Sequence, residues 1–191
     1  MNPQQRAIAL QDSLSQYREF SSDLYDEVVE EVSARANLSG SLGKADIGAL
    51  VVWKRLNAST RWAAELMKTS DRVVRKATAE SREAAVDKTL DIETAARLAR
   101  AALTPLPGFG TGDALASAVI YALAPTRMAV YDRRAQSGLE QLGLVLSARQ
   151  GRYSRYMALV EQLVIEADTV DVSLTPREID LALFTLGGAS T

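Results

Sequence analysis

A turn rich in proline and glycine, placed between two apolar segments, constrains the fold of this 191-residue chain more than any other feature. Pro107 stiffens the backbone before the turn, and Gly108 and Gly110 permit positive φ angles and close backbone approach. An alanine-rich apolar segment follows, and Asp132 closes the region. Such a turn leaves backbone N–H groups unpaired at the start of the next helix, where the macrodipole also favours an anion. The pattern predicts a phosphate-binding turn between two helices.

Helical periodicity dominates the remaining chain, and no alternating apolar pattern is long enough to assemble a sheet. We therefore expect an all-α fold. Serine and aspartate side chains mark helix starts at Ser59, Ser70 and Asp91, and a capping box begins at Thr175. The predicted helices cover residues 3–20, 23–37, 45–56, 59–68, 70–79, 91–103, 133–150 with an interruption near Gly143, 153–167, and 176–186, where Gly187 and Gly188 end the last one.

The clearest linker is the Leu38–Lys44 segment, whose sequence is LSGSLGK. It predicts an N-terminal helical appendage over residues 1–37, folded as a helical hairpin. The main helical domain would then cover residues 45–188.

Composition excludes several kinds of site. The chain contains neither cysteine nor histidine, which excludes disulfides, iron–sulfur clusters, thiolate zinc sites and imidazole catalysis. No apolar run approaches the ~20 residues of a membrane span, and the N-terminus is too polar for a signal peptide. We expect a cytoplasmic monomer whose chemistry, if any, uses carboxylates or hydroxyls.

Charge is unevenly distributed, although the net charge is only −2. Residues 51–165 carry 17 basic and 11 acidic side chains, whereas both ends of the chain are acidic. A basic centre is compatible with nucleic-acid contact, and charges that merely solvate helix surfaces give the same pattern. Arg72, Arg75 and Lys76 lie on neighbouring helical turns and form a candidate phosphate-facing stripe with the same alternative. Trp53, Tyr153 and Tyr156 are expected in the core; the alternatives are that Trp53 lines a base pocket and that the two tyrosines stack on bases.

The segment Leu106-Pro107-Gly108-Phe109-Gly110, followed by small residues and by Asp132, resembles the signature of the helix–hairpin–helix DNA glycosylase superfamily. It looks most like a bacterial group related to 8-oxoguanine DNA glycosylases, over about residues 45–188. The resemblance implies a helical base-excision repair enzyme, a hydrolase that binds double-stranded DNA. Residues expected to contact DNA are Arg72, Arg75, Lys76, Leu106, Pro107, Gly108, Phe109, Gly110, Thr111 and Arg133.

The resemblance also assigns roles. N–H groups around Gly108, Gly110 and Thr111 would contact a phosphate beside the target nucleotide. No cofactor is expected, apart from a K⁺ or Na⁺ ion held by backbone carbonyls near Thr104, Leu106 and Phe109. Asp132 matches the aspartate that stabilises the oxocarbenium-like sugar or positions the attacking water, in keeping with electrostatic stabilisation of a cationic transition state. An N-cap role for Asp132 is compatible with this.

One departure from the family pattern narrows the chemistry. Members that use a Schiff-base amine carry a lysine two residues after the second hairpin glycine, where this chain has Gly112. We therefore expect a monofunctional glycosylase without a lyase step. Two alternatives stay open, namely a DNA-binding module that has lost its chemistry and a helical protein-interaction domain without a DNA role.

Overall fold

The structure, a computed structural model, describes residues 1–22, 24–58 and 61–188. These residues form helices, turns and loops without a β-strand, which confirms the all-α prediction. The predicted starts at Asp23 and Ser59 lie outside the described residues. The helices are α1 (Pro3–Phe20), α2 (Glu27–Ser39), α3 (Lys44–Trp53), α4 (Arg61–Lys68), α5 (Asp71–Val86), α6 (Ile92–Leu103), α7 (Ala114–Leu123), α8 (Arg133–Gln141), α9 (Arg152–Asp168) and α10 (Pro176–Gly188).

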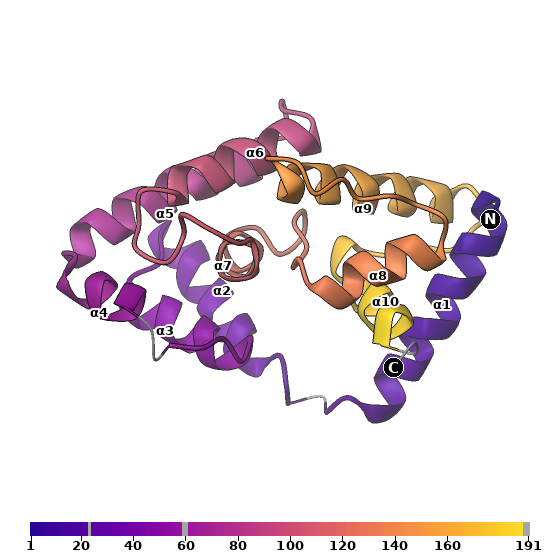
Figure 1. Ribbon diagram of the computed structural model, residues 1–191, viewed down its shortest axis with the longest axis horizontal. Coiled ribbons are helices and arrows are strands. Elements are labelled where there is room, and N and C mark those ends of the chain that lie inside the picture. Colours follow the sequence, from indigo (N-terminus) through magenta and orange to yellow (C-terminus); the bar gives the residue numbers. More distant parts are fainter. Residues whose placement is uncertain (23, 59–60, 189–191) are drawn as a thin grey trace.

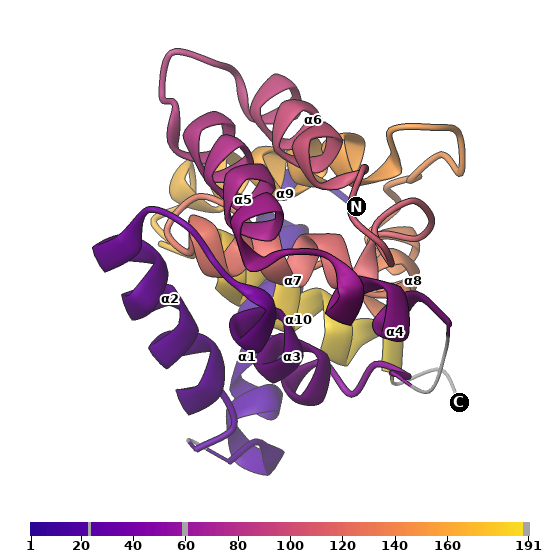
Figure 2. The same ribbon diagram turned by 90° about the vertical axis from the view of Figure 1, so that its left-hand side faces the viewer.

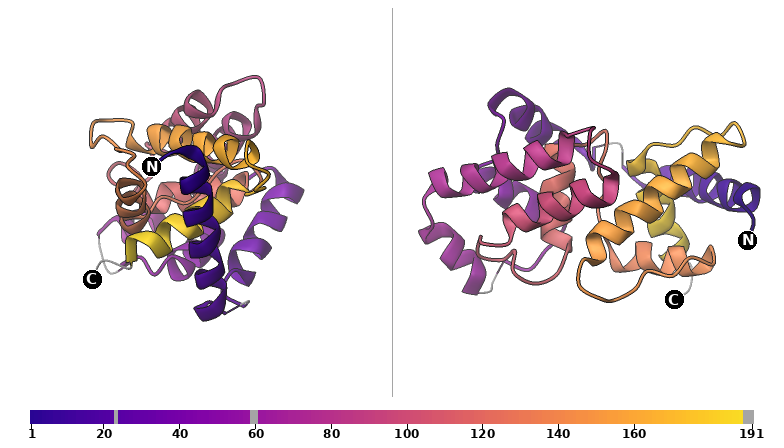
Figure 3. Two further views of the ribbon diagram at one scale, coloured as in Figure 1. Left: turned by 90° about the vertical axis from the view of Figure 1, so that its right-hand side faces the viewer. Right: turned by 90° about the horizontal axis from the view of Figure 1, so that it is seen from above.

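The helices lie in two groups. Helices α2 to α7 form one group, and α8, α9 and α10 form the other together with α1 (Figure 1; Figure 3, right). Helix α7 is apolar on nearly all sides and lies inside the first group, in contact with α2, α3, α5 and α6 (Figure 2). Helix α6 packs against both α5 and α9, and so it joins the two groups.

The predicted N-terminal hairpin is wrong, because α1 and α2 pack on different helices. Helix α1 buries Leu10 and Leu14 and lies against α9 and α10. Helix α2 buries Val29 and Val32 and lies against α3 and α7. Each apolar stripe is therefore covered by helices from a different group, and proximity in sequence does not make α1 and α2 a pair.

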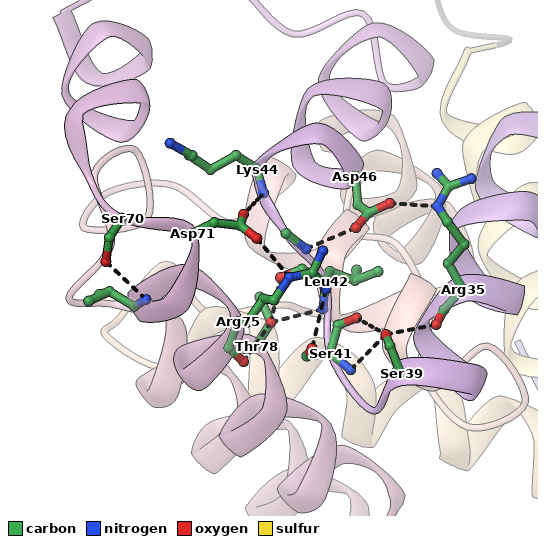
Figure 4. A network of polar contacts seen from close by, with 12 residues as sticks. Arg35, Ser39, Ser41, Leu42, Lys44, Asp46, Ser70, Asp71, Arg75 and Thr78 are labelled. Atoms are coloured by element: carbon green, nitrogen blue, oxygen red, sulfur yellow. Dashed lines mark hydrogen bonds and ion pairs between the residues drawn. The ribbon is translucent and has the colours of Figure 1, made fainter.

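The segment predicted as a linker connects α2 to α3, and its middle is buried against α5 (Figure 4). Leu42 is fully buried, and its N–H donates to Thr78 Oγ1 while its carbonyl accepts from the same hydroxyl. Asp71 accepts from the N–H of Lys44 and pairs with Arg75. Glycine and serine correctly indicated a break between helices, but the break is tied down by these hydrogen bonds.

Two glycines allow α8 and α10 to cross at close range. A Cβ atom on Gly138 would lie 2.2 Å from the carbonyl oxygen of Leu183, and one on Gly187 would lie 1.8 Å from that of Arg134. The prediction that Gly187 ends the last helix is wrong, since α10 continues to Gly188. Its missing side chain serves helix packing instead.

Local capping signals were more reliable than helix ends. Ser70 and Asp91 accept the predicted N-cap hydrogen bonds, and Thr175 and Glu178 exchange those of the capping box. Helix α8 is shorter than predicted because it ends at Gln141, and Gly143 follows with φ at +79°. Across the described ranges, every helix is too short or too polar to cross a membrane.

Candidate nucleic-acid interface

A tight hairpin joins α6 to α7 at the predicted turn. Its apolar residues Leu106 and Phe109 are buried and anchor it in the core, so any contact they make with a ligand would use the backbone. Gly108 has φ at +90°, and a Cβ there would lie 2.4 Å from the ring of Trp62. The glycine is thus required both by its backbone angle and by the tryptophan packed on it.

The outer side of this hairpin presents backbone donors to solvent. Gly110 and Thr111 are exposed, and their N–H groups have no acceptor within the described part of the chain. Exposed, unpaired N–H groups beside the start of a helix suit an anion such as phosphate.

The expected cation site stays a prediction. Of the three carbonyls proposed as ligands, that of Leu106 also accepts the N–H of Phe109 at 3.0 Å. A carbonyl oxygen has a second lone pair, so this hydrogen bond is compatible with ion contact. In the described ranges, no cluster of three or more acidic side chains suits a multivalent metal.

A cavity of about 620 Å³ opens beside the hairpin and is lined by four arginines. We call it the arginine cavity; its cations are Arg97, Arg100, Arg149 and Arg152, and Gly110 and Gly112 belong to its wall. Asp113 pairs with both Arg100 and Arg152, at 3.3 and 3.0 Å. These ion pairs fix two of the guanidinium groups at the base of the hairpin.

The other two guanidinium groups are available to a ligand. Arg97 and Arg149 are exposed, and their side chains have no hydrogen-bond or ion-pair partner among the described residues. Helix α9 begins at the same cavity. Its N-cap residue is Gly151, so no side chain caps the start of this helix. The cavity therefore combines unpaired positive charge with a helix N-terminus, an arrangement suited to phosphate.

Asp132 is held at the start of α8 by two contacts. Its Oδ1 accepts the N–H of Arg134 at 2.9 Å, and its Oδ2 accepts from Lys54 Nζ at 2.8 Å. Burial raises the pKa of Asp132, but the hydrogen bond and charge of Lys54, with the N–H of Arg134, outweigh it and hold that pKa below its usual value. The carboxylate is therefore ionised at neutral pH, and its side chain is 27% exposed.

Helix α9 fixes the backbone that leads to Asp132. Tyr153 and Tyr156 are buried as predicted, and their hydroxyls donate to the carbonyls of Ala129 and Val130 at 3.0 and 3.3 Å. Burial raises the pKa of both tyrosines, which therefore stay neutral. Their structural role is to position the segment before Asp132.

A second cavity, of about 470 Å³, lies between α1, α3 and α10. We call it the aromatic cavity; its rings are Tyr17, Phe20, Tyr25, Trp53 and Phe184. Its cations are Lys54, Arg55, Arg134 and Arg177, and its lining carboxylate is Asp180. Arg55 lies over Tyr25 and Arg134 over Phe184, at 5.5 and 5.0 Å from the ring centroids.

Buried charges support one wall of the aromatic cavity. Arg177 pairs with Asp26 and Asp180 and lies over the ring of Trp53, whose Nε1 donates to Asp26. Burial raises the pKa of Asp180, although Arg177 acts in the opposite direction. Arg177 Nε is buried without a hydrogen-bond partner among the described residues.

Residues next to Asp132 connect it to both cavities. Its partner Lys54 and its neighbour Arg134 line the aromatic cavity. Its other neighbour, Tyr131, lies under the guanidinium of Arg152 from the arginine cavity, at 4.7 Å from the ring centroid. The predicted hairpin and the predicted aspartate are thus connected through Arg152 and Tyr131.

The predicted basic stripe on α5 is only partly available. Arg72 is exposed, whereas Arg75 pairs with Asp71 and contacts Ser41, and Lys76 lies 3.8 Å from Glu80. Neither the arginine cavity nor the role of Lys54 was predicted from the sequence, because these residues come from distant segments. The basic charge of residues 51–165 was the one general signal.

No protein-family model, curated protein or solved structure matches this chain in our comparisons.

Proposed function

We propose that the protein binds duplex DNA through its hairpin and arginine cavity and excises a modified base by hydrolysis at Asp132. The observation that carries this proposal is the ionised carboxylate of Asp132, whose partner Lys54 lines a cavity with aromatic walls and positive charge. The order of α6, glycine hairpin, α7 and Asp132 adds the resemblance to helix–hairpin–helix DNA glycosylases.

The proposed division of labour follows from the two cavities. Phosphates bind at the N–H groups of Gly110 and Thr111 and at the free arginines, and the extruded base stacks against rings of the aromatic cavity. As the C1′–N bond breaks, its electron pair leaves with the base and the sugar becomes cationic. The Asp132 carboxylate stabilises that cation, and water adds to C1′ and gives up a proton, which neutralises the departing base.

Duplexes carrying a panel of modified bases test this proposal. Wild type should convert at least one of them to an alkali-labile abasic site, and Asp132→Asn should not. Asp12→Asn is the matched control, because Asp12 is an exposed residue of α1 that lines neither cavity. Absence of an aspartate-dependent abasic product on every modified base would reject excision.

A DNA-binding module without chemistry is the second candidate. Both carboxylate oxygens of Asp132 are engaged by protein donors, which favours a purely structural N-cap. In that case duplex binding should be unchanged in Asp132→Asn and should weaken steeply with salt, while no modified base is released.

A further inference from the structure

The arginine cavity carries more positive charge than its lining carboxylate balances. Its lining contains four arginines and a single acidic side chain, Asp113, which leaves a net charge of +3. A phosphodiester within a DNA strand carries one negative charge, whereas a phosphate monoester carries about −1.5 to −2 at neutral pH. The charge of the cavity is therefore better matched to a monoester than to a diester.

Three of the four arginines have hydrogen-bond donors to spare. Arg97 and Arg149 have no side-chain partner among the described residues. Arg152 uses its Nε for Asp113, and its two terminal nitrogens have no acceptor in the described part of the chain. Arg100 differs, because each of its nitrogens donates to a protein acceptor. Three guanidinium groups with free donors suit the three terminal oxygens of a monoester, whereas a diester has only two.

A fifth arginine fixes the wall that carries Arg149. Arg155 lies on α9 and donates to the carbonyls of Ser147, Arg149 and Gln150, at 3.0, 2.6 and 2.7 Å. These contacts hold the segment before α9, and they place a cation on carbonyl oxygens that would otherwise repel an anion. The wall is therefore pre-organised, which lowers the cost of ordering it around a ligand.

We propose that the arginine cavity binds a phosphate monoester, namely the terminal phosphate at a break in a DNA strand. The inference rests on the proposed function, because duplex DNA bound at the adjacent hairpin supplies the strand end. Diester phosphates contact the N–H groups of Gly110 and Thr111, and the terminal phosphate enters the cavity and contacts the free guanidinium groups.

Duplexes closed by a loop at each end test the proposal, because a central nick is then the only strand end. The nick carries a 5′-phosphate, a 3′-phosphate, hydroxyl groups only, or a phosphate capped as its methyl ester. In fluorescence anisotropy, wild type should bind one of the two phosphate nicks at least about 10-fold more tightly than the hydroxyl nick. The methyl ester has one charge and two free oxygens, and it should lose most of this preference.

Two double variants separate the cavity from general surface charge. Arg97→Gln combined with Arg149→Gln should reduce the preference to within about twofold. Arg61→Gln combined with Arg72→Gln is the matched control, because both arginines are exposed and line neither cavity. The control should keep the preference, since a general loss of DNA affinity cancels in the ratio.

The outcomes distinguish this inference from the proposed function. Equal affinity of wild type for all the nicks overturns the terminal-phosphate site and leaves duplex binding and excision standing. A preference that survives in the cavity variant assigns the phosphate to another surface and also overturns the site. A cavity-dependent preference without release of any modified base supports the site and rejects excision. Failure to bind any duplex overturns the strand end as the source, and titration with thymidine 5′-monophosphate then shows whether a free nucleotide supplies the same group.

Discussion

Two arginines of the arginine cavity and Arg177 of the aromatic cavity hold their positive charge in opposite ways. In the arginine cavity, Arg97 and Arg149 are exposed and unpaired within the described ranges. In the aromatic cavity, Arg177 is 14% exposed, lies on an indole ring and is paired with two aspartates. Free surface charge attracts a polyanion from a distance, whereas fixed charge against rings selects a shape.

This contrast suggests that affinity and chemistry are separable. Binding to the DNA backbone should depend on the arginine cavity and should respond to salt. Base selection and excision should depend on the aromatic cavity and on Asp132, with little effect on affinity. Substitutions in one cavity therefore test whether the other works independently.

The largest expected effect is on chemistry alone. Asp132→Asn removes the charge that stabilises the cationic sugar, so the single-turnover excision rate should fall by about 10³-fold. Duplex affinity should stay within about threefold, because the amide oxygen can still accept the N–H of Arg134 and only the contact with Lys54 is lost. Fluorescence anisotropy measures the affinity. An equal loss of binding and excision would show that the two cavities act as one unit.

The next effect is on affinity alone. Replacing both Arg97 and Arg149 with glutamine should weaken duplex binding by about 10- to 100-fold at moderate salt. Each lost phosphate contact should also reduce the slope of log K against log salt by about one. Lys88→Gln, at the opposite end of α6 from the hairpin, should change neither quantity. An unchanged salt slope in the double variant would contradict the role of the arginine cavity.

A smaller effect concerns the helix crossing that supports the aromatic cavity. Gly187→Ala forces a methyl group into the backbone of α8 and should lower the free energy of unfolding by about 2–3 kcal/mol. Gly48→Ala has no atom within 4 Å of the added Cβ and should raise it by about 0.5–1 kcal/mol. Urea unfolding measures both. Equal effects would mean that the crossing is not tightly packed.

The smallest effect is a change in pH dependence. Lys54→Ala removes the hydrogen bond and charge that lower the pKa of Asp132, and burial then raises that pKa. The acid limb of the excision profile should move to higher pH. In wild type, the ionised carboxylate stabilises the fold above its unfolded pKa, and this contribution disappears as pH falls through the folded pKa. An unmoved acid limb would assign that limb to another group.

Helix caps were predictable where they depend only on residues close in sequence. Asp91 and Thr175 were identified as caps because each satisfies N–H groups within three residues along the chain. Gly187 was misinterpreted because the same residue type that ends helices also permits close crossings. The two roles of glycine are distinguished here only by the backbone of Arg134 on α8, which is remote in sequence from Gly187.

Only the part of the candidate site that is one continuous stretch of sequence was predictable. The hairpin at Gly108 and Gly110 is one stretch of sequence, and so is its link to Asp132. Arg97 and Arg149 line one cavity because α6 packs on α9, which follows Arg149 in sequence, and Lys54 reaches Asp132 through the packing of the two groups. A single sequence does not reveal such pairings, since they depend on tertiary structure.

The placement of α1 has a consequence for synthesis on the ribosome. Helices α2 to α7 can pack on one another as they emerge, because their partners are close in sequence. Helix α1 must wait for α9 and α10, which contain Glu166 and Glu178, the partners of Arg6 and Arg18. At ordinary translation rates this delay is on the order of 10 s. During it, the apolar stripe of α1 is open to chaperones, and the group of α1, α8, α9 and α10 closes only after α10 is made.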